Sequence, residues 1–278
     1  MTVNYERRGS GSPLVLMHGI GHRWQAWEPV MDRLAETHDV IALDLPGFGN
    51  SPALPAPYSV EAAVDAAVET FASLGITQPH LAGNSLGGML ALELASRGHA
   101  QSVTALAPAG FWTSARGRAW ALRLLTMIRT TGRLSPRTQA AVMNRKPLRM
   151  VSGSLLFGHP SRVPVEVMLG DLAAMAAAPG FDAVAAAGRD YFFTSPPPTV
   201  PVTIAWGTRD RILWPTQARR AAELLPNARH VSLPGCGHVP MHDEPDLIAQ
   251  TILDTCASVT GKAGLSTPPA DKAATHPA

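Results

Sequence analysis

The sequence predicts an α/β protein with a mostly parallel central sheet of seven or eight strands, helices on both faces, and a helical lid inserted between two strands. Three observations support this fold class. Short, uninterrupted apolar runs are typical of strands that are buried on both faces. Segments of helical periodicity separate these runs, as in a parallel sheet. The alternation stops at residues 111–195, where only helix signals occur.

The elements before residue 111 form strand–helix–strand units. Residues 14–17 are a short apolar run that ends at the loop beginning with His18. Ser59 is a suitable N-cap, because its side chain can accept a hydrogen bond from a free backbone N–H at the start of a helix. The predicted elements are strands at 14–17, 40–43, 80–82 and 103–106 and helices at 26–36, 59–74 and 86–97.

The segment 111–195 carries its own helix signals. Ser114 is a candidate N-cap, Ser135 is followed by proline at the first helical position, and Pro164 begins another helix. The segment ends at Ser195, which precedes three prolines and a stiff return to the sheet. We therefore expect an all-helical lid over the carboxyl edge of the sheet.

Strands and helices resume after the lid. Strands are predicted at 202–206 and 230–233, and helices at 216–225 and 244–257. The predicted domains are a core of residues 1–110 and 196–260, the lid at 111–195, and a tail at 261–278. The tail lacks apolar periodicity and is expected to be disordered.

The composition indicates a globular protein that acts on a small molecule. Hydrophobic residues make up 46% of the chain, but no apolar run approaches the roughly 18 to 20 residues of a membrane span, so no integral membrane segment is expected. The net charge of +2 is too small to indicate nucleic acid as a partner. The N-terminus lacks the apolar core of a signal peptide, which predicts a cytoplasmic protein. Cys236 and Cys256 show no metal-ligand spacing, so we expect two free thiols and no metal.

The charge is distributed unevenly. The lid contains ten arginines and one lysine against four acidic residues, a net charge of +7, whereas the rest of the chain carries −5. Solvated faces of amphipathic helices explain this excess, and an anionic substrate, partner or membrane surface is the other interpretation. Flexible thioethers in the lid suit either plain packing or an adaptable apolar pocket. The lid methionines are Met127, Met143, Met150, Met168 and Met175.

The strongest chemical signal is Ser85, in the motif Gly83-Asn84-Ser85-Leu86-Gly87 between a predicted strand and a predicted helix. Such a turn holds the serine in a strained conformation with its hydroxyl accessible. The flanking glycines are needed because a Cβ atom at either position would collide with the neighbouring strand or helix. This context predicts Ser85 as a nucleophile.

A serine hydroxyl is a poor nucleophile unless an adjacent base takes its proton. His238 lies in a loop directly after the last predicted strand and therefore at the same sheet edge as Ser85. His242 is close by, but the residues 243–245 that follow it are typical of a solvent-facing helix start. We therefore predict His238 as the general base.

The base needs an acid that orients its imidazole. Asp210 follows the strand at 202–206, and the chain order of Ser85, Asp210 and His238 is the order of serine, acid and histidine expected on this fold. Asp44 also ends a strand, but it precedes the serine and its Pro-Gly turn indicates a structural role.

Two backbone N–H groups are needed where negative charge develops. Leu86 supplies one because it follows the nucleophile, and Ile20 is the best candidate for the other. The loop that carries Ile20 contains His18, Gly19 and Gly21, which we expect to support the donor.

These residues resemble the α/β-hydrolase family over residues 3–258, apart from the lid. The matching pieces are His18-Gly19-x-Gly21, Asp44-x-Pro46-Gly47-x-Gly49-x-Ser51, Gly83-x-Ser85-x-Gly87-Gly88, Gly207-x-x-Asp210 and Gly237-His238. The resemblance implies a sheet of eight strands or one fewer, a helical cap, and acyl-enzyme chemistry without metal or cofactor. The motif around Ser85 is also similar to that of meta-cleavage-product C–C hydrolases, in which tryptophan usually follows the histidine, whereas Val239 follows His238 here.

The primary hypothesis is a serine hydrolase that cleaves a carboxylic ester of a small or medium, largely apolar substrate. Three alternatives remain open. They are a C–C bond hydrolase of anionic dienoates that uses the lid arginines, a cofactor-free perhydrolase resembling haloperoxidases, and a non-catalytic ligand-binding protein on a hydrolase scaffold. Fold alone does not decide among them.

Overall fold

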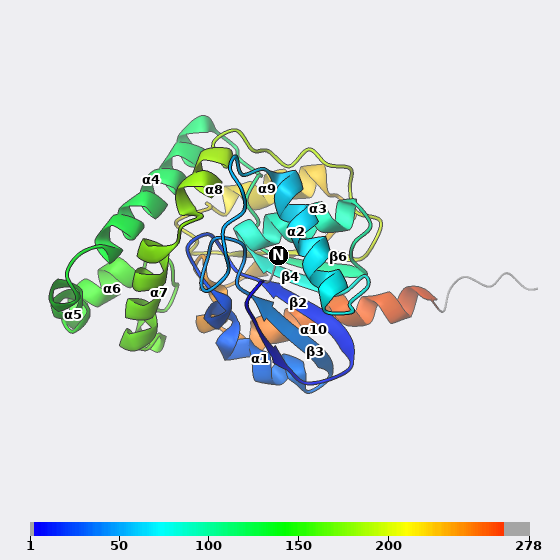
Figure 1. Cartoon of the computed structure of the whole chain (residues 1–278), viewed down its shortest axis with the longest axis horizontal. Coiled ribbons are helices and arrows are strands. Elements are labelled where there is room, and N and C mark those ends of the chain that lie inside the picture. The colour runs from blue at the N-terminus through cyan, green and yellow to red at the C-terminus, as the bar shows by residue number, and fades with distance from the viewer. Residues whose placement is uncertain (1–2, 264–278) are drawn as a thin grey trace, which may run out of the picture.

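Seven strands form one sheet in the order β1-β3-β2-β4-β5-β6-β7 in a computed structural model that describes residues 3–263 (Figure 1). Every neighbouring pair is parallel except β1 and β3. The predicted fold class is therefore confirmed. The strands are β1 (Tyr5–Arg8), β2 (Ser12–Met17), β3 (His38–Leu43), β4 (His80–Asn84), β5 (Ser102–Leu106), β6 (Val202–Gly207) and β7 (Arg229–Leu233).

Strand β1 was not expected from the sequence. It reads Tyr5-Glu6-Arg7-Arg8 and has no apolar run, because it lies at the edge of the sheet and exposes every second residue. Charged side chains on an edge strand also discourage pairing with another chain. The central strands β2 to β5 are almost completely buried, as their apolar runs predicted.

Helices cover both faces of the sheet. On one face, α1 (Glu28–Ala35), preceded by the short 3-10 helix at Trp24–Trp27, and α10 (Pro245–Ala263) pack on a core that includes Leu14, Leu16 and Val40. On the other face, α2 (Val60–Ser73), α3 (Leu86–Ser96) and α9 (Thr216–Leu224) pack on Val15, Met17 and Ile41. Alternate residues of one strand thus enter opposite cores, as the twofold period of a strand requires. Ser59 caps α2 by accepting a hydrogen bond from the Ala62 N–H, as predicted.

The segment of residues 111–195, which we call the helical insertion, lies between β5 and β6 and projects from one end of the sheet in Figure 1. Ser114 and Ser135 cap their helices as predicted, and Pro164 directly precedes the fourth. The insertion contains α4 (Ala115–Gly132), α5 (Pro136–Met143), α6 (Lys146–Gly153), a 3-10 turn at Pro160–Arg162, α7 (Val165–Ala177) and α8 (Phe181–Ala187).

The end of the chain departs from the prediction in one respect. Helix α10 extends to Ala263, so the first three residues of the predicted tail belong to a helix. The remainder of that tail lies outside the described residues. No single helix within residues 3–263 is both long and apolar enough to cross a membrane.

Candidate active site

Ser85 occupies the sharp turn between β4 and α3. Its φ of 55° and ψ of −110° lie in a region that non-glycine residues rarely adopt, at a cost of about 1–3 kcal/mol. The surrounding backbone holds the turn, because the Ser85 N–H donates to the Leu106 carbonyl at 2.9 Å and the Ser85 carbonyl accepts from the Met89 and Ala109 N–H groups. The strained turn predicted from the sequence is present.

The glycines on either side of Ser85 are required by close backbone contacts. A Cβ atom on Gly83 would lie 2.2 Å from the Gly87 carbonyl oxygen, and one on Gly87 would lie 2.0 Å from the Met17 carbonyl oxygen. Both distances are shorter than any van der Waals contact allows. The collisions expected from the motif therefore follow from the path of β2 and the first turn of α3.

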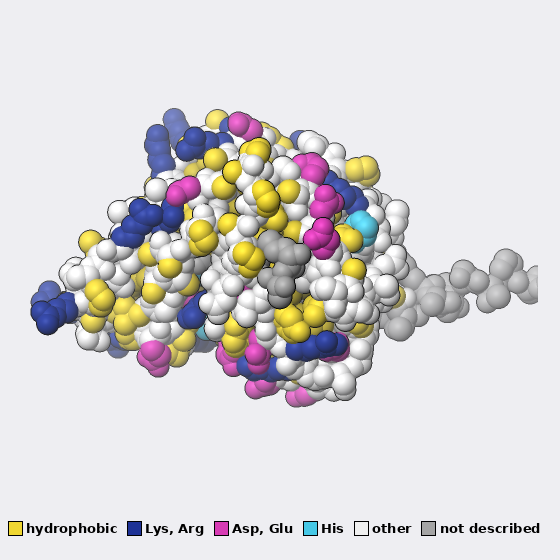
Figure 2. Space-filling view, in the orientation of Figure 1, with side chains coloured by type: hydrophobic (Ala, Val, Ile, Leu, Met, Phe, Trp, Pro, Cys, Tyr) yellow, Lys and Arg dark blue, Asp and Glu magenta, His cyan; other side chains and the backbone are white. Residues whose placement is uncertain are grey.

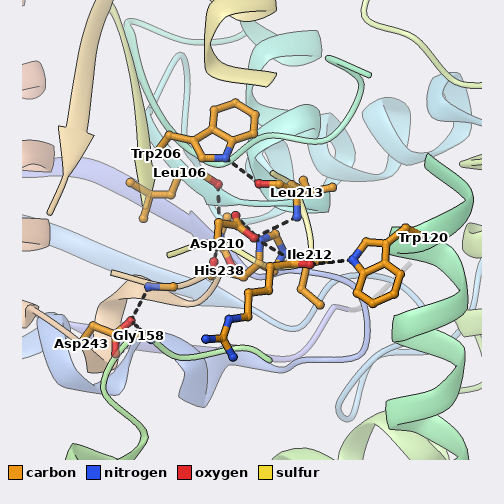
Figure 3. A network of polar contacts seen from close by, with 12 residues as sticks. Leu106, Trp120, Gly158, Trp206, Asp210, Ile212, Leu213, His238 and Asp243 are labelled. Atoms are coloured by element: carbon orange, nitrogen blue, oxygen red, sulfur yellow. Dashed lines mark hydrogen bonds and ion pairs between the residues drawn. The ribbon is translucent and has the colours of Figure 1, made fainter. Parts of the chain in front are cut away.

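Asp210 and His238 form a hydrogen-bonded pair at the carboxyl edge of the sheet. The Asp210 Oδ2 lies 2.8 Å from the His238 Nδ1, and both side chains are buried. The other carboxylate oxygen accepts the backbone N–H groups of Ile212 and Leu213, each at 2.9 Å (Figure 3). This arrangement fixes the carboxylate and leaves the Nε2 atom of His238 as the nitrogen that can serve a substrate.

Asn84 connects Ser85 to the histidine loop. Its amide donates to the carbonyl oxygens of Leu106 at 3.1 Å and His238 at 2.9 Å, so β4 holds the backbone of the histidine directly. Sequence reasoning gave Asn84 no role. Its position in the sequence could have indicated this role, because Asn84 directly precedes Ser85 at the end of a strand that shares a sheet edge with the histidine loop.

Ser85 and His238 line one small cavity of about 10 Å³, together with Gly19, Ile20, His22 and Asn84. The hydrogen bonds among residues 3–263 do not include one between the Ser85 hydroxyl and His238. Catalytic hydrogen bonds are often long without substrate and tighten when it binds. The structure thus brings the three predicted residues to one edge, with the acid–histidine contact formed.

The backbone N–H groups of Ile20 and Leu86 are available for a ligand. Neither donates to a protein acceptor in the part of the chain that the structure describes. Both residues border, with Ser85, a second cavity of about 70 Å³ that includes Trp112 and Tyr191. Gly19 allows the loop that carries Ile20 to lie close to Ser85, because a Cβ atom on Gly19 would be only 3.3 Å from the Ser85 Cβ.

His18 braces the loop that carries Ile20. Its Nδ1 lies 2.7 Å from the Gly19 carbonyl and its Nε2 accepts the Leu45 N–H at 2.9 Å, which fixes the neutral tautomer with the proton on Nδ1. Burial lowers the pKa of His18 to about 4. Asp44 also has the expected structural role, since it accepts the N–H groups of Trp24 and Asn50.

The helical insertion contacts both loops that carry the acid and the histidine. The Leu156 carbonyl accepts the N–H groups of His238 at 2.7 Å and Val239 at 3.0 Å. On the other loop, the Trp120 indole donates to the Arg211 carbonyl at 2.8 Å (Figure 3). The insertion therefore holds the backbone of both loops through hydrogen bonds.

The expected helix start is present, because α10 begins at Pro245, but the expectation that it faces solvent was wrong for Asp243. Asp243 is fully buried and accepts the backbone N–H groups of Gly158, His159 and Gly237 at 2.6–2.8 Å. The carboxylate is needed because three N–H groups from two segments converge on it. His242 is only partly exposed and packs edge-on against Phe157.

The comparisons with known proteins agree with this geometry. A family model described as the alpha/beta hydrolase family matches residues 14–251, which includes the elements that carry Ser85, Asp210 and His238. The chain belongs to the α/β hydrolase family.

Two curated relatives cover only part of this α/β hydrolase. A pimeloyl-[acyl-carrier protein] methyl ester esterase of Aeromonas hydrophila is 42% identical over 95 residues, 34% of this chain and 36% of the relative. A 2-hydroxymuconate semialdehyde hydrolase of a Pseudomonas species is 44% identical over 100 residues, 34% of this chain and 35% of the relative. The chain thus matches about a third of the length of these relatives.

A solved structure supports the fold over nearly the whole chain. A thermophilic esterase from Thermogutta terrifontis superposes with a TM-score of 0.72 at 24% identity, covering 92% of this chain and 93% of that chain. At this identity, the likeness concerns the fold.

The α/β hydrolase has a larger, mostly apolar cavity whose lining residues, apart from His22, all belong to the insertion. This methionine cavity has a volume of about 140 Å³ and is lined by Met127, Met143, Met168 and Met175, with His22 and Asp171 among its polar residues. Four of the five lid methionines thus face one cavity. His22, Leu156 and Met175 also line the small cavity that contains Ser85 and His238, so the two spaces adjoin.

The basic residues of the insertion lie away from these cavities. No lysine or arginine is among the described residues that line the cavities beside Ser85. Arg118, Arg123 and Arg189 border a separate hollow of about 490 Å³, and dark blue side chains stand at the outer edge of the insertion in Figure 2. Arg129 instead pairs internally with Asp182. The charge excess therefore belongs largely to the outer surface.

One other cluster offers ligand atoms. His38, His80 and Cys256 present atoms within 4.8 Å of one another. His38 and His80 begin their strands, so the cluster lies at the edge opposite Ser85. Burial raises the pKa of the Cys256 thiol to about 12, which keeps it protonated, whereas a metal takes the thiolate. Both cysteines are free, as predicted.

Proposed function

We propose that this α/β hydrolase is a serine esterase that cleaves a carboxylic ester through an acyl-enzyme intermediate. The observation that carries the proposal is the buried Asp210–His238 hydrogen bond at the cavity that contains Ser85 in its strained turn. A serine at such a turn, with a histidine whose second nitrogen is held by a carboxylate, is the arrangement that activates a hydroxyl for acyl transfer.

In this mechanism, the Ser85 Oγ attacks the ester carbonyl while the His238 Nε2 takes its proton. Asp210 keeps the Nδ1 proton in place and stabilises the imidazolium. The backbone N–H groups of Ile20 and Leu86 receive the oxyanion, a contribution of about 3–4 kcal/mol per donor. His238 then passes the proton to the departing alkoxide, which leaves the acyl group bound to Ser85. A water molecule, deprotonated by His238, attacks this acyl-enzyme, and the acid is released as Ser85 regains its proton.

Two apolar cavities, one lined by Ser85 and one adjoining the small cavity of Ser85 and His238, support a small or medium, largely apolar ester. The named activity of the Aeromonas hydrophila relative is that of a methyl ester esterase, which agrees with this reaction. We also propose that the insertion acts as the lid, with residues 1–110 and 196–260 as the core, because it contacts both loops that carry Asp210 and His238.

The test is a panel of aryl esters with acyl chains of two to ten carbons, assayed with wild type and Ser85→Ala. We expect hydrolysis by wild type and a loss of at least about a thousandfold in kcat for the variant. Covalent labelling of Ser85 by an organophosphonate, detected by mass spectrometry, gives an independent readout. Equal activity of the two proteins, or no activity in either, would contradict the esterase proposal.

A C–C hydrolase of dienoates is the second candidate, because the Pseudomonas relative is named a 2-hydroxymuconate semialdehyde hydrolase. Such substrates are anionic, and a cation in the cavity would favour them. The described residues lining the cavities beside Ser85 include the carboxylate of Asp171 and no cation. Turnover of a ring-fission dienoate with little activity on simple esters would favour this candidate over the esterase.

A further inference from the structure

His22 is a buried histidine that the proposed mechanism does not use. It is 4% exposed, and neither ring nitrogen has a hydrogen-bond partner within residues 3–263. A buried polar group left without a partner costs about 1–3 kcal/mol, so such groups usually meet a ligand or water. The side chain lines both the methionine cavity and the small cavity of Ser85 and His238. It is therefore placed to contact a substrate beside the reacting carbonyl.

Asp171 gives the same cavity an acceptor. It is 9% exposed, lies on α7, and lines the methionine cavity. Burial lowers the pKa of His22, and it outweighs the negative charge of Asp171, which raises the pKa. His238 and Arg23 lower it as well, so the ring is neutral at pH 7. The guanidinium of Arg23 lies against Gly170 and is not among the residues that line the cavity. The cavity thus offers a carboxylate and a neutral imidazole among its polar groups.

His22 and Asp171 together favour a ligand group that can both donate and accept a hydrogen bond. A neutral imidazole offers one donor and one acceptor, and a carboxylate offers acceptors only. A hydroxyl can donate to Asp171 and accept from His22, whereas an anionic group would be repelled by the carboxylate. Most of the remaining lining is apolar, and the cavity volume of about 140 Å³ is close to the roughly 150 Å³ of an engineered cavity that binds benzene. It has room for an apolar group of about six carbons.

From this placement we propose that His22 and Asp171 form a specificity site for esters that carry a neutral hydroxyl within a few bonds of the scissile carbonyl and an apolar tail. The hydroxyl must be near the carbonyl because His22 and Ser85 share a cavity of only about 10 Å³. The tail occupies the methionine cavity. This inference rests on the proposed esterase function and names the substrate class for it.

Two matched substrate pairs test the proposal. Ethyl 3-hydroxyoctanoate and ethyl octanoate place the hydroxyl in the acyl arm, and 2-hydroxyoctyl acetate and octyl acetate place it in the alcohol arm. We expect kcat/KM to be about 10- to 100-fold higher for the hydroxylated member of one pair, the gain of hydrogen bonds to a charged group. Which pair shows the preference identifies the arm that enters the methionine cavity.

Variants then assign the preference to these residues. In His22→Phe and Asp171→Asn the ratio should fall to within about threefold of one, whereas His22→Gln, which keeps a donor and an acceptor, should retain part of it. Thr131→Val is the matched control. Thr131 lines the same cavity, but its hydroxyl already donates to the Ile128 carbonyl, so the ratio should be unchanged.

A binding measurement separates this inference from the esterase proposal. Calorimetry on full-length Ser85→Ala compares 3-hydroxyoctanamide with octanamide, and 2-hydroxyoctyl methyl ether with octyl methyl ether, none of which needs turnover. Tighter binding of a hydroxylated member, lost in Ser85→Ala/His22→Phe, supports the site even if no ester is hydrolysed. Ester hydrolysis with a ratio near one in both pairs, or a preference that survives in His22→Phe, overturns it.

Discussion

Asp243 is the residue whose removal tests the coupling between the helical insertion and the histidine loop. Its buried carboxylate accepts three N–H groups, from Gly158 at 2.8 Å, His159 at 2.6 Å and Gly237 at 2.8 Å. Two of these donors belong to the insertion and the third directly precedes His238. The Asp243→Ala variant leaves all three without an acceptor.

The expected loss of stability follows from these contacts. A buried donor without a partner costs about 1–3 kcal/mol, and removal of one partner from a buried charged network typically costs about 3–5 kcal/mol. We take the lower part of this range, because Gly158 and His159 are only partly buried and water can replace some of the lost contacts. The free energy of unfolding should fall by about 3 kcal/mol, and Tm by about 6–12 °C.

Urea unfolding followed by tryptophan fluorescence measures the loss. Asp246→Ala is the matched control, because Asp246 is a nearby carboxylate on α10 whose side chain is 92% exposed and whose ion pair with Arg33 should contribute at most about 1 kcal/mol. In Asp243→Ala, kcat/KM should also fall more than the folded fraction does, since Gly237 and His238 lose their anchor. A loss below about 1 kcal/mol, or one equal to that of the control, would refute the reasoning.

Three further predictions concern the network at the end of the insertion, the oxyanion loop and the basic surface. Glu93 accepts a hydrogen bond from the Tyr191 hydroxyl at 2.6 Å. Burial raises the pKa of Tyr191, and the Glu93 carboxylate raises it further. Ultraviolet titration of Glu93→Gln should therefore show one tyrosine ionising at lower pH than in wild type. Unfolded histidine takes up a proton below about pH 6.5, whereas folded His18 stays neutral down to about pH 4. Up to about 3 kcal/mol of stability is therefore present above pH 6.5 and is lost as the pH falls to 4. Urea unfolding of His18→Gln should show a shallower pH dependence of the unfolding free energy than wild type, and an identical slope would contradict this. No lysine or arginine is among the described residues that line the cavities beside Ser85, so kcat/KM for a neutral ester and for a carboxylate-bearing ester should change in parallel between 0.05 and 0.5 M salt. A selective fall of kcat/KM for the anionic ester would show that the insertion attracts it.

Local sequence was enough to place the catalytic candidates. The turn at Ser85 is specified by its own glycines, because any Cβ there meets backbone within 2.2 Å. The positions of Asp210 and His238 followed from strand order, since parallel strands place their carboxyl ends at one edge. Helix caps such as Ser114 and Ser135 were equally local, because each side chain bonds a backbone N–H three residues away. Strand β1 was not predicted, because an edge strand needs no apolar run.

Other features depended on the tertiary structure. Asp243 looked like part of an exposed helix start, yet its partner Gly158 is 85 residues away, and only the packing of the insertion buries the carboxylate. Asn84 reaches the His238 carbonyl across 154 residues. His22 and Asp171 belong to different segments, and neither carries a motif that links them. The sequence alone thus determined the residues that we propose perform the reaction, because short-range backbone geometry encodes them. Tertiary packing decided the cavity that would select the substrate, because that cavity combines His22 with residues between 127 and 175 that come from several helices.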